Sequence, residues 1–178
     1  GCPSLFTLKV ASLVGVVWWG LVLLWLARPR FAAADSQGAR GFKLLAGSLC
    51  ALPAWCALGW LHSEDPLGPR WTLFALALVW AADSGAYFTG SKFGKRKLAP
   101  AISPGKTWEG VFGGLAASVL LAALVLPLLG LSWSSLPALA LLTLATAAIS
   151  VVGDLFESLL KRHSGVKDSG AIFPGHGG

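Results

Sequence analysis

Charged residues are scarce in this sequence, and methionine is missing altogether. Only 12% of the 178 residues are charged, whereas 55% are hydrophobic, and the mean hydropathy is +0.70. A soluble domain of this length could not bury so much apolar surface in one core. The composition therefore indicates an integral membrane protein. Because the first residue is Gly1 and no Met is present, we expect the sequence to be a fragment of a longer chain.

Cysteine is also rare, and its positions do not suit a zinc site. Cys2, Cys50 and Cys56 lack the paired spacing and the neighbouring histidines that such a site needs. We expect these side chains to be buried small apolar groups. Tryptophan, by contrast, is frequent, and residues such as Trp18 and Trp25 fall in apolar runs. An aromatic belt at the membrane interface is the ordinary explanation for them.

Five apolar runs are long enough to cross a bilayer, which needs about 20 residues. They lie near residues 5–27, 42–61, 71–88, 111–131 and 136–153. The first run is too long for the core of a signal peptide and lacks a cleavage site after it, so we predict a membrane helix there. The sequence thus predicts an all-α, polytopic membrane protein, with residues 1–178 forming a single membrane-embedded domain.

Basic residues concentrate in alternate links between these runs. The links 28–43 and 89–110 and the segment 154–178 hold most of the 14 lysines and arginines. The positive-inside rule therefore predicts that these three segments face the cytosol, with the first residue outside. Topology and contact with anionic membrane lipids then explain the net charge of +6. We expect no nucleic-acid partner.

Acidic residues are few, and two of them stand in or beside predicted membrane helices. An ionised Asp83 in the third run would cost about 2.5–3.5 kcal/mol on insertion scales, so it should face a partner or a cavity. Asp83 also lies toward the predicted C-terminal end of its helix, where the macrodipole disfavours a carboxylate without a cation. Asp154 follows the fifth run, and Glu157, on the same face, is suitably spaced to pair with Lys161. Asp83 and Asp154, with Asp168, are candidate oxygen ligands for Mg²⁺.

The link 89–110 contains a second candidate for phosphate binding. Gly105-Lys106-Thr107 looks like the end of a P-loop, but that motif needs a glycine where this chain has Pro100, and a preceding strand. We therefore reject a P-loop. A Pro-Gly turn would instead lead into the fourth span, whose free backbone N–H groups, with Lys106 alongside, would form a phosphate cradle. An ordinary basic loop is the alternative.

The segment 158–178 mixes both charge signs with glycines and a histidine. Lys161-Arg162 and Lys167-Asp168 bring together cations and a carboxylate, which suits a site for phosphate and a divalent cation. A solvated tail whose basic residues contact anionic lipid would explain the charges equally well. The spacing of the residues favours the site.

The segment 158–178 resembles the signature of the phosphatidate cytidylyltransferase (CDP-diacylglycerol synthase) family. The shared positions are Ser158, Lys161-Arg162, Lys167-Asp168, Gly170, Phe173-Pro174 and His176-Gly177-Gly178. Motifs of the same family recur upstream as AD-x-GAY at 82–87, LAP at 98–100, SPGKTWEG at 103–110 and GDLFES at 153–158. The family pattern continues past the two glycines to an Asp-Arg pair and a further Asp. Whether the 178 residues are active alone depends on those carboxylates.

The resemblance implies an enzyme of phospholipid biosynthesis that converts CTP and phosphatidate to CDP-diacylglycerol and pyrophosphate. It would use Mg²⁺ and act at the cytosolic face of a bacterial-type inner or plasma membrane. The candidate metal ligands are Asp83, Asp154 and Asp168, and the candidate catalytic residues are Asp154, Lys161, Arg162 and Asp168. The candidates for binding CTP or lipid phosphate are Lys106, Ser158, Lys161, Arg162, Lys167 and His176.

Two alternative functions stay open at this point. One is a CTP-dependent enzyme acting on a polyprenyl or archaeal ether lipid, either as a cytidylyltransferase or as a lipid kinase. The other is a membrane transporter or a structural membrane protein, with Asp83 lining a pathway. The oligomeric state is also open, with a homodimer among the alternatives.

Overall fold

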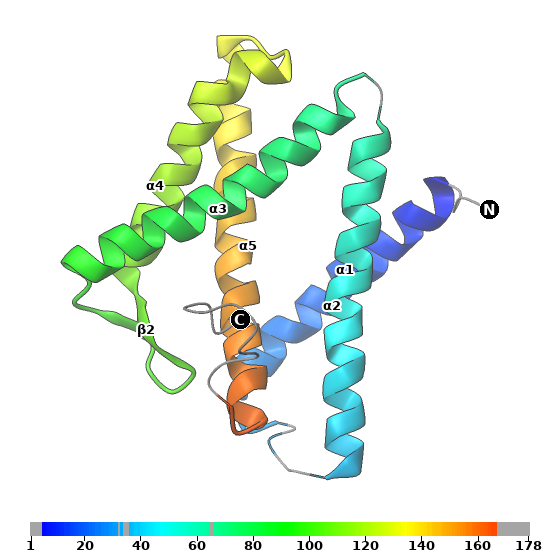
Figure 1. The fold of residues 1–178 in the computed structure, drawn as a ribbon, viewed down its shortest axis with the longest axis vertical. Helices are drawn as coiled ribbons and strands as arrows, with labels where there is room; N and C mark the ends of the chain where they lie inside the picture. The colour runs from blue at the N-terminus through cyan, green and yellow to red at the C-terminus, as the bar shows by residue number, and fades with distance from the viewer. Residues whose placement is uncertain (1–4, 32, 34–35, 65, 167–178) are drawn as a thin grey trace. The chain divides into compact units, whose positions relative to one another are not determined.

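The computed structural model describes residues 5–31, 33, 36–64 and 66–166. Within these residues lie five long helices: α1 (Leu5–Leu26), α2 (Gln37–Ser63), α3 (Gly68–Phe93), α4 (Trp108–Val125) and α5 (Leu136–His163) (Figure 1). Short 3₁₀ turns, η1 (Leu126–Leu129) and η2 (Trp133–Ser135), separate α4 from α5. All five helical segments are long and apolar enough to cross a membrane. The prediction of an all-α membrane protein with about five spans is confirmed.

The helices reach further than the apolar runs from which they were predicted. The second begins at Gln37 rather than near 42, the third ends at Phe93 rather than near 88, and the fifth ends at His163 rather than near 153. A helix satisfies its own backbone hydrogen bonds, so it can continue past the apolar stretch into polar sequence. The extra turns carry several of the candidate site residues.

A short hairpin joins α3 to α4, which the sequence did not predict. Strands β1 (Lys97–Ala99) and β2 (Ser103–Thr107) pair antiparallel, with Lys97 opposite Thr107 and Ala99 opposite Ser103. The hairpin lies at the end of α3 and α4 in Figure 1. It gives the basic link 89–110 a defined shape in place of an irregular loop.

The described residues belong to two compact units. One contains Gly1–Ala57 and Gly153–Gly178, and the other contains Leu58–Val152. Helices α2 and α5 each contribute residues to both units. The candidate site residues are accordingly divided between the units.

The unit Leu58–Val152 is built on close contact between α3 and α4, which run side by side (Figure 1). A Cβ added at Gly114 would lie 2.6 Å from the carbonyl oxygen of Ala82, and one added at Gly85 would lie 2.6 Å from the Cβ of Ala117. Small residues let two membrane helices approach backbone to backbone, where van der Waals packing holds them together. This contact supports the hairpin that joins the two helices.

Beyond that contact, the same unit has an apolar core. Phe74, Leu78, Leu126 and Leu139 are almost fully buried in it. The outward-facing apolar side chains of these helices remain exposed, as expected where lipid surrounds the protein. Among them are Leu73, Leu120, Leu124 and Leu141.

The other unit is organised around Phe156, whose side chain is only 2% exposed. Its ring meets those of Trp18, Trp19 and Trp25 edge-on, with centroid separations of 6.4, 6.3 and 5.1 Å. Edge-to-face contacts of this kind add to the gain from burial. Trp18 and Trp25 are therefore packed inside the protein, and an interfacial belt is the wrong explanation for them. The cluster fixes the last turns of α5 against α1.

All three cysteines were expected to be buried, but Cys50 and Cys56 are only half-buried, and Cys2 lies outside the described residues. Cys50 and Cys56 are free thiols on α2. The indole N–H of Trp18 donates to the Sγ atom of Cys50 at 3.2 Å. This contact connects α1 to α2 within the unit that contains Phe156.

Candidate active site

Four polar residues near the end of helix α5 lie on one side of it. Because α5 continues to His163, Asp154 is inside the helix and not in a tail after it. At 3.6 residues per turn, positions 154, 158, 161 and 162 fall on the same side of the helix. We call Asp154, Ser158, Lys161 and Arg162 the signature face. Phe156, only 2% exposed, falls on the opposite side and packs in the aromatic cluster, and Leu159, also 2% exposed, lies between the two sides.

One predicted ion pair beside the signature face is confirmed. The Nζ atom of Lys161 lies 3.1 Å from the Oε1 atom of Glu157, one helical turn away. Glu157 is exposed and Lys161 is partly exposed, so water and salt screen the pair, and a pair one turn apart on a helix contributes about 0.3–0.5 kcal/mol. Glu157 therefore orients Lys161 without consuming its capacity to bind a phosphate.

Helix α5 ends in a glycine cap directly after the signature face. Gly165 has a φ of 70°, and its N–H donates to the carbonyl of Arg162, while the N–H of Val166 donates to the carbonyl of Lys161. These two bonds satisfy carbonyls of the last turn that would otherwise lack partners. The remaining candidates Lys167, Asp168 and His176 lie outside the described residues.

His163, the last residue of α5, has partners in two other segments. Its Nε2 atom lies 2.6 Å from the carbonyl oxygen of Pro29, and because a carbonyl can only accept, Nε2 carries the proton. The Nζ atom of Lys43 donates to the carbonyl oxygen of His163 at 2.9 Å. A cation is favourable at the C-terminal end of a helix. Lys43 and Pro29 thus tie the end of α5 to α2 and to the link after α1.

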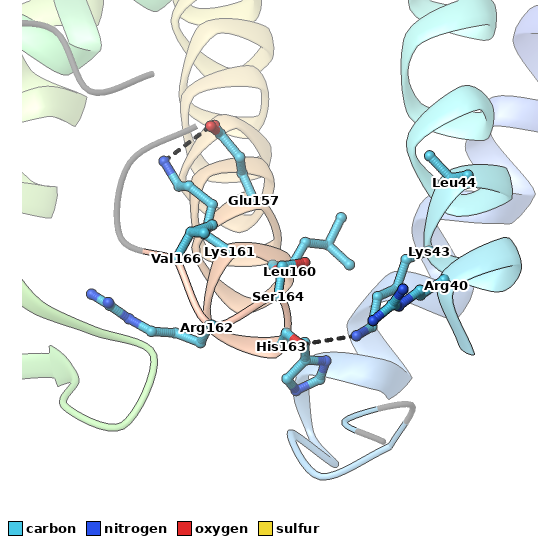
Figure 2. Close-up of a pocket in the computed structure, with 11 residues that line it drawn as sticks. Arg40, Lys43, Leu44, Glu157, Leu160, Lys161, Arg162, His163, Ser164 and Val166 are labelled. Carbon is cyan, nitrogen blue, oxygen red and sulfur yellow. Dashed lines mark hydrogen bonds and ion pairs between the residues drawn. The ribbon is translucent and has the colours of Figure 1, made fainter. Parts of the chain in front are cut away.

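A cavity lies between the start of α2 and the end of α5 (Figure 2). Its volume is about 930 Å³, and Lys161 and Arg162 line it together with two cations from α2, Arg40 and Lys43. The sequence analysis assigned Arg40 and Lys43 only to a basic link. Their spacing of three residues at the start of a helix was the available signal, because it puts both on one face.

The fourth helix does not begin with the free backbone N–H groups that were predicted. The N–H of Trp108 donates to the carbonyl of Arg96 at 2.9 Å, and the N–H of Gly110 donates to the Oγ1 atom of Thr107 at 3.2 Å. Thr107 is the N-cap residue, which is a preferred use of threonine. These two N–H groups therefore already have acceptors within the protein. The prediction that they form a phosphate cradle is wrong. Lys106 is half-buried on β2.

Glu109 holds the basic link in place, a role that the sequence analysis missed. Its carboxylate accepts hydrogen bonds from the backbone N–H groups of Lys95 and Arg96, each at 3.1 Å. The link after α3 is thereby fastened to the first turn of α4. An acidic residue two positions after an N-cap threonine could have indicated this, because acids are favoured in the first turn.

Asp83 lies in the middle of α3 rather than near its end. Because the helix continues to Phe93, the macrodipole argument for Asp83 is wrong: that effect is confined to the last turn. Asp83 is exposed. It belongs with Lys106 to the unit Leu58–Val152, whereas Asp154 belongs to the other.

The structure describes two of the three proposed metal ligands, Asp83 and Asp154. Among the residues that it describes, no three His, Cys, Asp or Glu side chains form a group that could hold a metal ion. The predicted set of Asp83, Asp154 and Asp168 includes one residue outside the described part. That set therefore stays a prediction.

Comparison with known proteins agrees with the resemblance in the terminal segment. The model of the Cytidylyltransferase family matches residues 4–178. The phosphatidate cytidylyltransferase of Haemophilus influenzae is 43% identical over 180 residues, which cover 96% of this chain and 62% of that protein. The phosphatidate cytidylyltransferase of Pseudomonas aeruginosa is 48% identical over 168 residues, covering 93% of this chain and 60% of that protein. This chain thus spans about three fifths of the length of these relatives.

Proposed function

Because this chain belongs to the cytidylyltransferase family, we propose that it transfers a cytidylyl group from CTP to phosphatidate. The products are CDP-diacylglycerol and pyrophosphate, as a step of phospholipid biosynthesis. The observation that carries the proposal is the signature face of α5, where Asp154, Ser158, Lys161 and Arg162 share one side of a helix end. The names of the relatives at 43% and 48% identity support the same reaction and favour an enzyme over a transporter or a structural protein.

The proposed chemistry needs positioning and charge neutralisation more than a dedicated base. A phosphate oxygen of phosphatidate attacks the α-phosphorus of CTP, and the bond from that phosphorus to the bridging oxygen of pyrophosphate breaks. The attacking phosphate is already ionised near neutral pH, so no proton has to be removed from it. Lys161 and Arg162 bind phosphate oxygens of the two substrates and lower the repulsion between them. Ser158, on the same face, orients a phosphate by hydrogen bonding.

We also propose that Mg²⁺ is the cofactor. Asp83, Asp154 and Asp168 supply carboxylate oxygens, and Mg²⁺ typically takes a few carboxylates, phosphate oxygens of the substrate and retained waters. When bound, it would neutralise charge that gathers on the departing pyrophosphate. The residues fit this donor chemistry, since hard oxygen ligands are what the set offers. Lys106, Lys167 and His176 are the remaining candidates for contacts with phosphate.

The proposed site faces the cytosol of a bacterial cell, where CTP is available. The concentration of basic residues in alternate links supports this orientation through the positive-inside rule. An integral membrane protein with its site at this boundary can receive one substrate from the bilayer and the other from water. The orientation can be checked by replacing the native cysteines with alanine and labelling a cysteine introduced at Ser158 from each side of the membrane.

Transfer of radioactive label from CTP to lipid tests the proposed reaction. Membranes containing the full-length protein are incubated with CTP labelled in the α-phosphate and with phosphatidate, a polyprenyl phosphate or an ether lipid phosphate. We expect label in the lipid fraction with phosphatidate, together with release of unlabelled pyrophosphate. Label on another acceptor would support the related lipid enzymes. A parallel incubation uses CTP labelled in the γ-phosphate. Label from that CTP in the lipid would identify a kinase, because cytidylyl transfer releases the γ-phosphate as part of pyrophosphate.

Removal of divalent cations is expected to abolish the transfer. After treatment with EDTA, the rate of CDP-diacylglycerol formation should fall by about 100-fold or more, because the charge of pyrophosphate is no longer neutralised. Excess Mg²⁺ should restore the rate, which controls for damage by the chelator. Ca²⁺ should restore it poorly, since its larger and more flexible coordination shell does not reproduce octahedral geometry. An undiminished rate in EDTA would exclude a role for a metal.

A further inference from the structure

The cavity between α2 and α5 is lined by both basic and apolar side chains, whereas the signature face is made of polar residues only. Arg40 and Lys43 enter it from the start of α2, and Lys161 enters from α5. Leu44 and Leu160 supply apolar surface between them. In Figure 2, Arg40 and Lys43 lie together on the side of α2 that faces α5.

The charge of this cavity favours an anion. Glu157 is its one carboxylate among the described lining residues, and Glu157 is paired with Lys161 at 3.1 Å. Arg40, Lys43 and Arg162 add positive charge beyond that pair. The volume of about 930 Å³ is within the range of cavities that bind small molecules, which is about 300–1,000 Å³.

The two cations of α2 have different capacities to bind a ligand. The Nζ atom of Lys43 is held 2.9 Å from the carbonyl oxygen of His163, so Lys43 fastens α5 to α2. Arg40 carries a guanidinium with five N–H donors in a planar fork, which can grip two oxygens of a phosphate and still keep a contact within the protein. Arg162 extends from α5 on the side away from Arg40 (Figure 2). Arg40 is thus the cation best suited to a ligand between the helices.

The lining suits the phosphate of a lipid better than a nucleotide. The described lining residues include no Trp, Tyr, Phe, Asn or Gln to stack on a base or read its edge. The one aromatic ring among them, His163, is held by its bond to the carbonyl of Pro29. They do include Leu44, Leu160 and Val166, which can contact acyl chains or a glycerol backbone. An apolar wall beside basic side chains at the end of membrane helices is the combination that a lipid phosphate needs.

We propose that Arg40 binds the phosphate of the lipid substrate, with Lys161 on the opposite wall of the same cavity. The proposal rests on the proposed function, because it assigns this cavity to the lipid acceptor of that reaction. It extends the site beyond the terminal segment to a helix that carries no part of the signature. Lys43 acts as a positioning residue, since its bond to His163 sets the distance between the two walls.

Steady-state kinetics of Arg40→Gln in the full-length protein test this assignment. We expect the KM for phosphatidate to rise about 10-fold or more, because one charged hydrogen-bond donor pair to phosphate is lost. The KM for CTP should stay within about twofold of the wild-type value if the nucleotide binds elsewhere. Arg40→Lys should recover part of the affinity for phosphatidate, because it keeps the charge without the planar fork. Arg30→Gln is the matched control, since Arg30 is an exposed cation of the same link that does not line the cavity.

A binding measurement separates this proposal from the proposed function. Wild type and Arg40→Gln are each reconstituted in phosphatidylcholine nanodiscs, and binding of added phosphatidate is compared with binding of inorganic phosphate for both proteins. Weaker binding of the variant to phosphatidate alone supports the lipid site, whereas an equal loss for inorganic phosphate indicates a general anion site and overturns it. An unchanged KM for phosphatidate in an active Arg40→Gln enzyme would overturn this inference only. A wild-type protein that forms no CDP-diacylglycerol would instead refute the proposed function.

Discussion

Asp154→Asn is expected to lower kcat for CDP-diacylglycerol formation by about 100-fold or more, if its carboxylate is a metal ligand. Asparagine keeps the size of the side chain but removes its charge. Asp154 is exposed on the signature face, so the substitution creates no cavity in the core. Membrane insertion and thermal stability should therefore match those of the wild type. The rate is measured with labelled CTP and phosphatidate at saturating Mg²⁺.

Glu64→Gln provides the matched control for this substitution. Glu64 accepts a hydrogen bond from the indole N–H of Trp60 at 2.8 Å, in the link between α2 and α3. The same change from carboxylate to amide at that position should leave kcat within about twofold, since surface substitutions away from a site usually have small effects. Near-normal turnover of Asp154→Asn at every Mg²⁺ concentration would refute the metal role of Asp154.

Phe156→Ala is expected to destabilise the protein by about 3–5 kcal/mol, the usual cost of deleting a buried aromatic ring. The ring is 2% exposed and contacts Trp18, Trp19 and Trp25, so its removal leaves a cavity that these stiff side chains cannot fill. Because Phe156 anchors the same turns that carry the signature face, activity should also fall. Thermal denaturation in detergent, followed by the assay on the folded fraction, measures both effects.

Phe112→Ala is the control for the loss of an aromatic ring. Phe112 is 62% exposed on α4, so its removal from the protein leaves no internal cavity. The melting temperature of Phe112→Ala should therefore stay close to that of the wild type. Equal destabilisation by Phe112→Ala and Phe156→Ala would show that the aromatic cluster does not anchor α5.

The membrane architecture followed from composition because lipid imposes a simple rule on the chain. Every spanning segment must satisfy its own backbone, so a long apolar run predicts a helix with little ambiguity. The same rule does not say where a helix ends. Helix α5 continues to His163 because its polar last turns are amphipathic, with Phe156 facing the aromatic cluster and Asp154 facing away. Hydropathy alone cannot detect that change of pattern.

The candidate site was predictable where its residues are close in sequence and not where they meet by folding. Glu157 and Lys161 are one turn apart, so their ion pair could be foreseen from spacing. The bond from Lys43 to the carbonyl of His163 joins residues separated by 120 positions, and nothing local indicates it. The hairpin β1–β2 was missed for a different reason. Its strands are short and interrupted by Pro104, so they lack an alternating pattern.

The central claim is that carboxylates from two membrane helices hold a divalent cation beside the signature face. Anomalous diffraction from crystals of the full-length protein grown with Mn²⁺ and CTP tests it most directly. We predict an anomalous peak at coordination distance from carboxylate oxygens of both Asp83 and Asp154. A bound cation with neither residue among its ligands, or Asp83 and Asp154 at opposite faces of the membrane, would contradict the account.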